Sequence, residues 1–100
     1  MVEKVIWMPT AIFTYRQSIE YLIEEWSGKY ANDFIALADK KIEFICVNPE
    51  MNRRSQKAKM IFSVKINKRI RLYYRYRPLK KQIDLLLFWN SWQNPAKLKY

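Results

Sequence analysis

The segment 65–81, KINKRIRLYYRYRPLKK, carries eight lysine and arginine residues and no acidic residue. In a strand running from 69 to 77, alternation places Arg69, Arg71, Tyr73, Arg75 and Arg77 on one face. The apolar and tyrosine side chains between them point to the opposite face, toward a core. Because like charges two residues apart on a strand repel, the pattern costs stability unless an anion binds there. We therefore expect an anion-binding face rather than an ordinary solvated sheet surface.

Three residues of this segment have side chains suited to chemistry at a phosphodiester. Cleavage of RNA by its own 2′-oxygen needs a base, an acid and stabilisation of charge at the phosphate. Lys65 is the candidate base, Arg71 can hold phosphate oxygens in a bidentate manner, and Tyr73 can stack on a nucleobase or donate a proton. The chain contains no histidine, the usual proton-transfer residue. Simple contact with backbone phosphates is therefore an alternative role for each of the three.

The positive charge extends beyond this strand, and it belongs to one half of the chain. Residues 1–50 hold five basic and eight acidic side chains, whereas residues 51–100 hold fourteen basic side chains and a single acid, Asp84. Such a balance, with +10 overall, predicts an anionic partner: nucleic acid, an acidic protein segment or an acidic membrane surface. The candidate nucleic-acid contacts are Arg53, Arg54, Lys57, Lys59, Arg69, Arg75 and Arg77, although the first four also suit a solvated loop. Phe88, Trp89 and Trp92 are interpreted mainly as packing residues.

The composition excludes several other classes of protein. One cysteine, Cys46, and no histidine leave no basis for an intramolecular disulfide or a zinc site. We expect neither a metal nor another cofactor. The longest uncharged apolar stretch, 85–89, is far shorter than the roughly 20 residues that cross a bilayer. The N-terminus lacks the apolar run of a signal peptide. We expect a single domain over 1–100, located in the cytoplasm and not associated with a membrane.

Helical signals dominate the first half of the chain. Residues 3–8 are predicted to form a short strand that is apolar on both faces and therefore suits an inner position in a sheet. Pro9 then begins a helix, with a predicted buried stripe of Ile12, Tyr15, Ile19, Leu22 and Trp26. Gly28 is predicted as a left-handed cap at its end.

A second helix is predicted from about residue 30 until Asn48-Pro49, with its own buried stripe: Ala31, Phe34, Ile35, Ala38, Ile42 and Ile45. Residues 48–58 have the composition of a loop. Three strands follow at about 59–66, 69–77 and 82–89, with a tight turn at Asn67-Lys68. We predict an α+β fold: an N-terminal strand, an antiparallel two-helix hairpin and three antiparallel strands, together forming a four-stranded sheet.

This order resembles that of the RelE/ParE family of bacterial type II toxins. VIWMPTA resembles the opening strand and proline-started helix, and ANDFIALADKKIEFICVNPE resembles the second helix with its Asn-Pro stop. KRIRLYYRYRPLKKQIDLLLFW is similar to the strand pair of the family, and FWNSWQNPAKL to the tail of one branch. The resemblance covers about ninety residues and rests on their joint order.

The resemblance implies a toxin that is neutralised by a cognate antitoxin, which the charge predicts to be acidic. RelE-like members cut messenger RNA on the ribosome, and ParE-like members inhibit DNA gyrase without cleaving RNA. Arg71 matches the arginine that RelE-like toxins use at the scissile phosphate, and Lys65 lies near a RelE lysine. The tail departs from the pattern, because Trp92 stands near where an arginine is expected, and the usual catalytic tyrosine or histidine beyond it has no secure match. We favour messenger RNA cleavage, with gyrase inhibition as one alternative. The other is an inactive domain that binds only nucleic acid or antitoxin.

Overall fold

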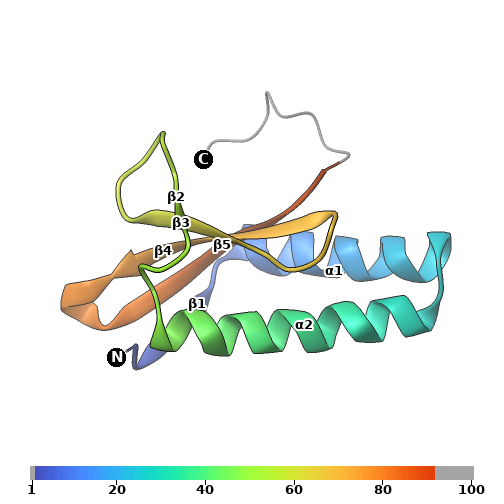
Figure 1. Ribbon diagram of the computed structural model, residues 1–100. Helices are drawn as coiled ribbons and strands as arrows, with labels where there is room; N and C mark the ends of the chain where they lie inside the picture. The colour runs from blue at the N-terminus through green and yellow to red at the C-terminus, as the bar shows by residue number, and fades with distance from the viewer. Residues whose placement is uncertain (1, 92–100) are drawn as a thin grey trace.

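The computed structural model describes residues 2–91, which form two helices and a five-stranded sheet (Figure 1). In chain order the elements are β1 (Lys4–Trp7), α1 (Pro9–Glu25), α2 (Gly28–Val47), β2 (Arg53–Arg54), β3 (Ile61–Lys65), β4 (Ile70–Arg77), a 3₁₀ turn (Pro78–Lys80) and β5 (Gln82–Asn90). The α+β fold and its element order are as predicted. The short strand β2, which falls in the segment predicted as loop, makes the fifth strand.

The two helices begin and end where local sequence signals place them, with one exception. Pro9 occupies the first turn of α1, where its missing N–H costs nothing. Ser27 caps α2, and its side chain accepts a hydrogen bond of 3.4 Å from the backbone N–H of Tyr30. The prediction that Gly28 forms a left-handed cap is wrong, because it is the first residue of α2 and has no positive φ. Only Trp26 and Ser27 separate the two helices, so Ser27 is already the N-cap residue of α2.

The sheet has the strand order β1-β5-β4-β3-β2. β1 runs parallel to β5, and all other neighbouring strands are antiparallel. The N-terminal strand therefore lies at the edge of the sheet, and its predicted inner position is wrong. Its apolar character has another cause: Trp7 packs on Tyr15 and Phe88 on one side, with ring centroids 5.0 and 5.7 Å apart. On the other side Ile6 lies opposite Asp84.

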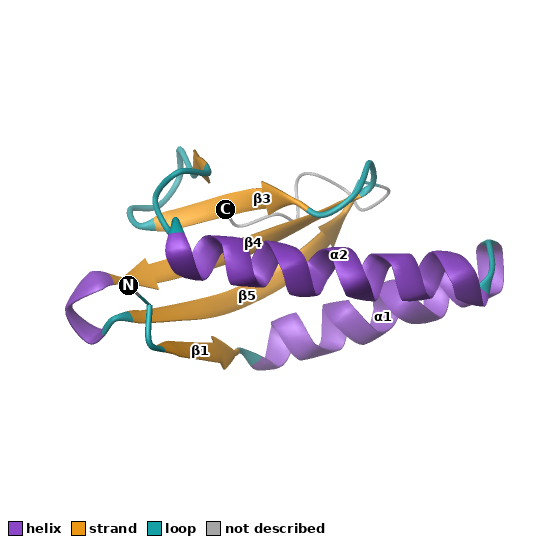
Figure 2. Cartoon of the chain, turned by 60° about the horizontal axis from the view of Figure 1, so that its bottom comes forward, coloured by secondary structure: helices purple, strands orange, loops and turns teal. Residues whose placement is uncertain are grey.

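Both helices lie on one face of the sheet (Figure 2), which we call the inner face. Phe62, Leu72, Tyr74, Ile83 and Phe88 are buried there, at the centre of the hydrophobic core. No helix or strand of residues 2–91 packs on the opposite face, which we call the outer face. The alternation in β4 thus sends its apolar residues into the core and leaves arginine and Tyr73 on the outer face.

α1 is rotated relative to the predicted stripe. Its most buried residues are Ala11, Thr14, Ser18 and Leu22, whereas Ile12 and Trp26 are exposed. The cause is a polar contact with the sheet: β1 pairs with β5 only as far as Leu85, and beyond it the N–H of Phe88 donates to Thr14 Oγ1 at 2.9 Å. Small side chains allow α1 to approach β5 closely enough for this bond. In α2 the predicted stripe is confirmed, with Ala31, Phe34, Ala38 and Ile45 buried.

The loop after α2 is tied to the core by Tyr74. The hydroxyl of Tyr74 donates to the carbonyl of Pro49 at 2.8 Å and accepts from Asn52 Nδ2 at 3.0 Å. Burial raises the pKa of Tyr74, although the hydrogen bond from Asn52 acts in the opposite direction. These bonds place β2 beside β3 and so bring the basic loop next to the outer face.

Candidate nucleic-acid interface

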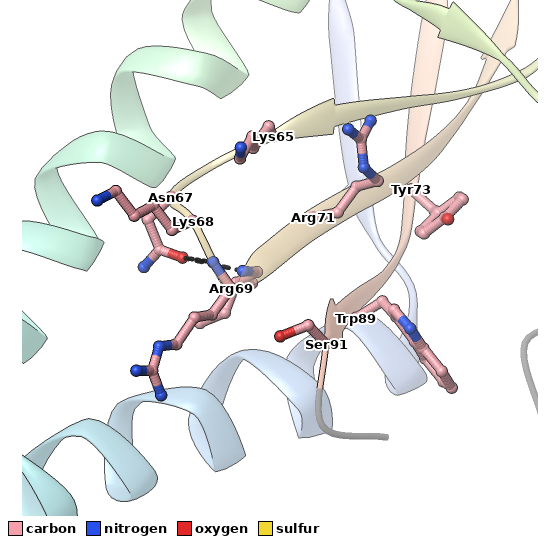
Figure 3. A pocket seen from close by; sticks show the side chains of 9 residues that line it. Lys65, Asn67, Lys68, Arg69, Arg71, Tyr73, Trp89 and Ser91 are labelled. Atoms are coloured by element: carbon pink, nitrogen blue, oxygen red, sulfur yellow. Dashed lines mark hydrogen bonds between the residues drawn. The ribbon is translucent and has the colours of Figure 1, made fainter. Parts of the chain in front are cut away.

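Lys65, Arg71 and Trp89 form a row across three strands of the outer face. Lys65 lies opposite Arg71 in the β3–β4 register, and Arg71 lies opposite Trp89 in the β4–β5 register. Directly opposed residues have Cβ atoms about 5 Å apart, so two like charges are held together in this row. Tyr73 follows Arg71 on the same face, about 7 Å further along β4. All four residues line one open hollow of about 430 Å³ (Figure 3).

Arg71 is held in position by a neighbouring side chain. Its Nη1 donates to Ser63 Oγ at 2.9 Å. Ser63 is buried and lies on β3 opposite Tyr73, whereas Arg71 itself lies opposite Lys65. The guanidinium of Arg71 therefore leans toward Ser63 and the Tyr73 end of the hollow. This bond uses one donor of five in the guanidinium group. The remaining donors suit an anion in the hollow.

The side chain of Arg69 turns from the outer face toward α1, which corrects the predicted alternation at this position, although Arg69 still lines the hollow. Its guanidinium carbon lies 4.9 Å from the centre of the Trp26 ring, at the end of α1. Figure 3 shows the side chain of Arg69 pointing toward α1, away from Arg71. The cause is the β3–β4 turn, in which Asn67 Oδ1 accepts hydrogen bonds from the N–H groups of Arg69 and Ile70. β4 begins only at Ile70, so strand alternation does not extend back to Arg69.

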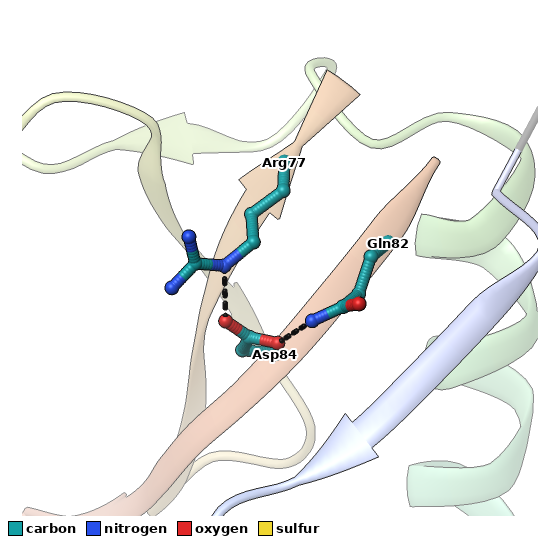
Figure 4. Close-up of polar contacts among 3 residues, drawn as sticks. All are labelled: Arg77, Gln82 and Asp84. Atoms are coloured by element: carbon teal, nitrogen blue, oxygen red, sulfur yellow. Dashed lines mark hydrogen bonds and ion pairs between the residues drawn. The ribbon is translucent and has the colours of Figure 1, made fainter. Parts of the chain in front are cut away.

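Arg77 is engaged by the single acid of the basic half. Its Nε donates to Asp84 Oδ2 at 2.7 Å, and Gln82 Nε2 donates to the other carboxylate oxygen at 2.6 Å (Figure 4). Burial alone would raise the pKa of Asp84, but the hydrogen bonds from Arg77 and Gln82 and the charges of Arg77 and Arg75 lower it below its ordinary value. Arg75 lies opposite Asp84 in the register. Part of the positive charge on the outer face is therefore balanced within the fold.

The four basic residues predicted as nucleic-acid contacts in the loop after α2 lie in different places in the structure. Arg53 pairs with Ser63 and so shares the outer face, whereas Arg54 pairs with Phe62 on the inner face. The guanidinium of Arg54 lies 5.1 Å from the centre of the Phe62 ring and forms an exposed ion pair of 3.6 Å with Glu50. Lys57 and Lys59 are exposed in the loop between β2 and β3. The structure thus brings Arg53 to the outer face and directs Arg54 to the inner one.

Ser63, which holds Arg71, and Trp89, which lines the hollow, were not predicted as functional residues. Ser63 interrupts the apolar run of β3, and alternation places it with Lys65, so this polar residue was a usable signal. Trp89, interpreted as a packing residue, is half-buried and lies at the edge of the hollow. Trp92 and the rest of the tail that resembles one branch of the family lie outside the described residues.

Within residues 2–91 no three acidic, cysteine or histidine side chains are grouped so that they could hold a metal ion. In the same part of the chain, no helix combines the length and the apolar character needed to cross a bilayer.

Comparison with known proteins identifies the fold. No protein-family model and no curated protein matches the sequence. The structure is similar to a chain from a structure described as a chromosomal ParDE TA system from P. aeruginosa, with a TM-score of 0.72 and 12% sequence identity. The similarity covers 90% of this chain and 96% of the other. The chain therefore has a RelE/ParE-like fold, as the order of its sequence motifs predicted.

Proposed function

We propose that this protein is the toxin of a type II toxin–antitoxin pair and that it acts on RNA through the outer face of its sheet. The observation that carries the proposal is the row of Lys65, Arg71 and Trp89, with Tyr73 beside it, around one open hollow. Opposed cations at this position are unfavourable in the free protein and become favourable when a phosphate lies between them. The similarity in fold to a chain from a ParDE system supports the assignment to toxin–antitoxin pairs.

The proposed chemistry is cleavage of messenger RNA on the ribosome. Arg71, held by Ser63, binds the phosphate oxygens and stabilises the charge that develops there. Lys65, directly opposite, takes the proton from the attacking 2′-hydroxyl. Tyr73 or Trp89 stacks on a neighbouring base, a contact worth about 1–3 kcal/mol per base. Tyr73 is also the proposed proton donor to the leaving oxygen.

The proposed partner is a cognate antitoxin with an acidic segment that folds on binding. Carboxylates of this segment pair with outer-face cations such as Arg53, Arg71 and Arg75, and so exclude RNA by both charge and bulk. Hydrogen exchange of the complex tests this, because protection is expected at β3, β4 and the β2–β3 loop. Protection confined to the acidic residues Glu20, Glu24 and Glu25 of α1 would contradict it.

Arg71→Ala tests the role of the outer face in toxicity. Expression of the unaltered protein is expected to stop growth, and Arg71→Ala is expected to abolish this effect. The matched control is Arg16→Ala, which removes the same charge from the exposed side of α1 and is expected to stay toxic. Thermal unfolding of both variants shows whether the fold survives. A folded, fully toxic Arg71→Ala protein would remove the outer face from the mechanism.

A second candidate function is inhibition of DNA gyrase without RNA cleavage. It is favoured by the ParDE description of the similar structure and by the lack of histidine in the chain. The two functions differ in the first event after induction. Messenger RNA cleavage arrests translation before any DNA damage response, whereas gyrase inhibition raises the damage response while translation continues. Incubation of purified ribosomes, message and protein then tests cleavage directly.

A further inference from the structure

One exposed side of α2 carries an apolar stripe that is not part of the core, although Tyr30 at its start also packs edge to face on Trp26. Tyr30, Leu37 and Phe44 are 51%, 38% and 42% exposed, although each is a large hydrophobic residue. They are seven residues apart, so they lie on one line along the helix, about 10 Å from one to the next. The buried residues of α2, such as Phe34 and Ile45, lie on a different side of the helix.

The stripe is symmetric about Leu37. Tyr30 and Phe44 lie at equal distances on either side of it, so an antiparallel copy of α2 centred on Leu37 places Tyr30 of one protomer against Phe44 of its partner. This contact occurs twice in the pair, and Leu37 meets its own copy on the two-fold axis. A surface that is complementary to itself in this way is what an isologous dimer requires.

The charges beside the stripe have the same symmetry. Asp33 and Lys40 are exposed, and both flank the stripe on the same side of the helix. Among residues 2–91, neither has an ion-pair partner in the monomer. In the antiparallel arrangement Asp33 of one protomer lies beside Lys40 of its partner. The two residues are offset along the helix axis by only one residue, roughly 1.5 Å. The two ends of the contact therefore each gain an ion pair of opposite charges.

We propose that the α2 stripe is a homodimer interface, in which the α2 helices of two copies of this chain pack antiparallel across a two-fold axis at Leu37. Because the stripe lies in the helical layer, the outer face stays open in the dimer, and the inference is independent of the proposed function. One helix pair buries a small area, so the dimer is weak, with a Kd of about micromolar or higher, and it dissociates on dilution below that concentration. Association is thus expected to depend on protein concentration.

Sedimentation measurements test the existence of the dimer. The unaltered protein is expected to shift from monomer to dimer as its concentration rises, and Leu37→Glu, which places two like charges on the axis, is expected to stay monomeric. The control is Ile23→Glu, since Ile23 is an equally apolar and exposed residue of α1 outside the stripe. A monomer at every concentration, or equal weakening by both variants, would overturn the proposal.

Charge exchange tests the flanking pair. Asp33→Lys is expected to weaken dimerisation by roughly 2- to 30-fold, because the pair occurs twice and each exposed pair contributes little. Combining it with Lys40→Asp restores opposite charges and is expected to recover most of the affinity. If the double variant is no tighter than Asp33→Lys alone, these two residues do not meet across the interface.

Crosslinking tests the antiparallel register in a Cys46→Ser background, where an introduced cysteine is the single thiol. With a short bis-maleimide, Leu37→Cys is expected to link to itself. Tyr30→Cys and Phe44→Cys are each expected to link poorly alone and efficiently when mixed. Efficient self-linking of Tyr30→Cys would indicate a parallel pair. If the protein is monomeric and Leu37→Glu instead no longer binds a co-expressed acidic partner, the stripe is the binding surface for that partner. A parallel pair and a partner-bound stripe would each refute the antiparallel dimer.

Discussion

Replacing Asp84 with asparagine tests how the basic sheet tolerates its charge. Asp84 is 3% exposed and accepts two short hydrogen bonds, from Arg77 and from Gln82. Asparagine has the same size but one acceptor oxygen, so Asp84→Asn removes the charge and turns an amide N–H toward a donor. We expect the bond to Arg77 to be lost.

The magnitude follows from the surroundings of the pair. A hydrogen bond to a charged group contributes about 1.5–3 kcal/mol, and breaking a fully buried ion pair costs about 3–5 kcal/mol. The side chain of Arg77 is 40% exposed, so water solvates it when its partner is lost. We therefore expect a loss of about 2 kcal/mol in the free energy of unfolding. For a domain of this size that corresponds to a fall in Tm of about 8–16 °C.

The effect is expected to depend on pH in a defined direction. Since the pKa of Asp84 in the folded protein is below its ordinary value of 3.8, its charge stabilises the fold fully above that value. This stabilisation is lost as the pH falls through the lower folded pKa. The difference in stability between the unaltered protein and Asp84→Asn should therefore be constant near neutral pH and shrink below about pH 3.8.

Urea unfolding at pH 7 and at pH 3 measures both quantities. The control is Glu3→Gln, because Glu3 forms an exposed ion pair of 3.3 Å with Lys81 that should contribute less than about 1 kcal/mol. If Asp84→Asn is as stable as the unaltered protein at pH 7, the carboxylate does not balance Arg77. If it is destabilised by the same amount at both pH values, the loss comes from packing instead of charge.

Three further outcomes are expected. Thr14→Val should destabilise the fold by about 1–3 kcal/mol in thermal unfolding, because the buried N–H of Phe88 loses its acceptor; an unchanged Tm would place water or another acceptor there. Tyr74→Phe should cost about 1 kcal/mol and speed hydrogen exchange in the loop after α2, which its hydroxyl holds; unaltered exchange would show that packing alone holds the loop. In RNA binding, Arg71→Ala should reduce the slope of log affinity against log salt concentration by about 1, whereas Arg69→Ala should reduce it by less, because the guanidinium of Arg69 is turned onto Trp26. Equal reductions would return Arg69 to the outer face.

The sequence by itself determined which residues of β4 share a face. Strand periodicity is a property of the backbone, so Arg71, Tyr73 and Arg75 fall on one side whatever the rest of the chain does. The same reasoning holds for Lys65, which the short β3–β4 connection brings opposite Arg71. The existence of both helices, the start of α1 and the end of α2 were also predictable, because Pro9 and the Asn48-Pro49 stop act locally.

Only the tertiary structure decided the direction of side chains at the ends of elements and the rotation of α1. Arg69 lies on Trp26 because a turn directs it toward a helix end that is 43 positions away in the sequence. Thr14 faces the core because β1 ends at Trp7 and leaves an N–H of β5 to be satisfied. Asp84 is buried because Arg77 and Gln82 converge on it from two strands. Apart from the local bond between Gln82 and Asp84, these contacts join residues whose proximity depends on how strands and helices pack, which local periodicity does not encode.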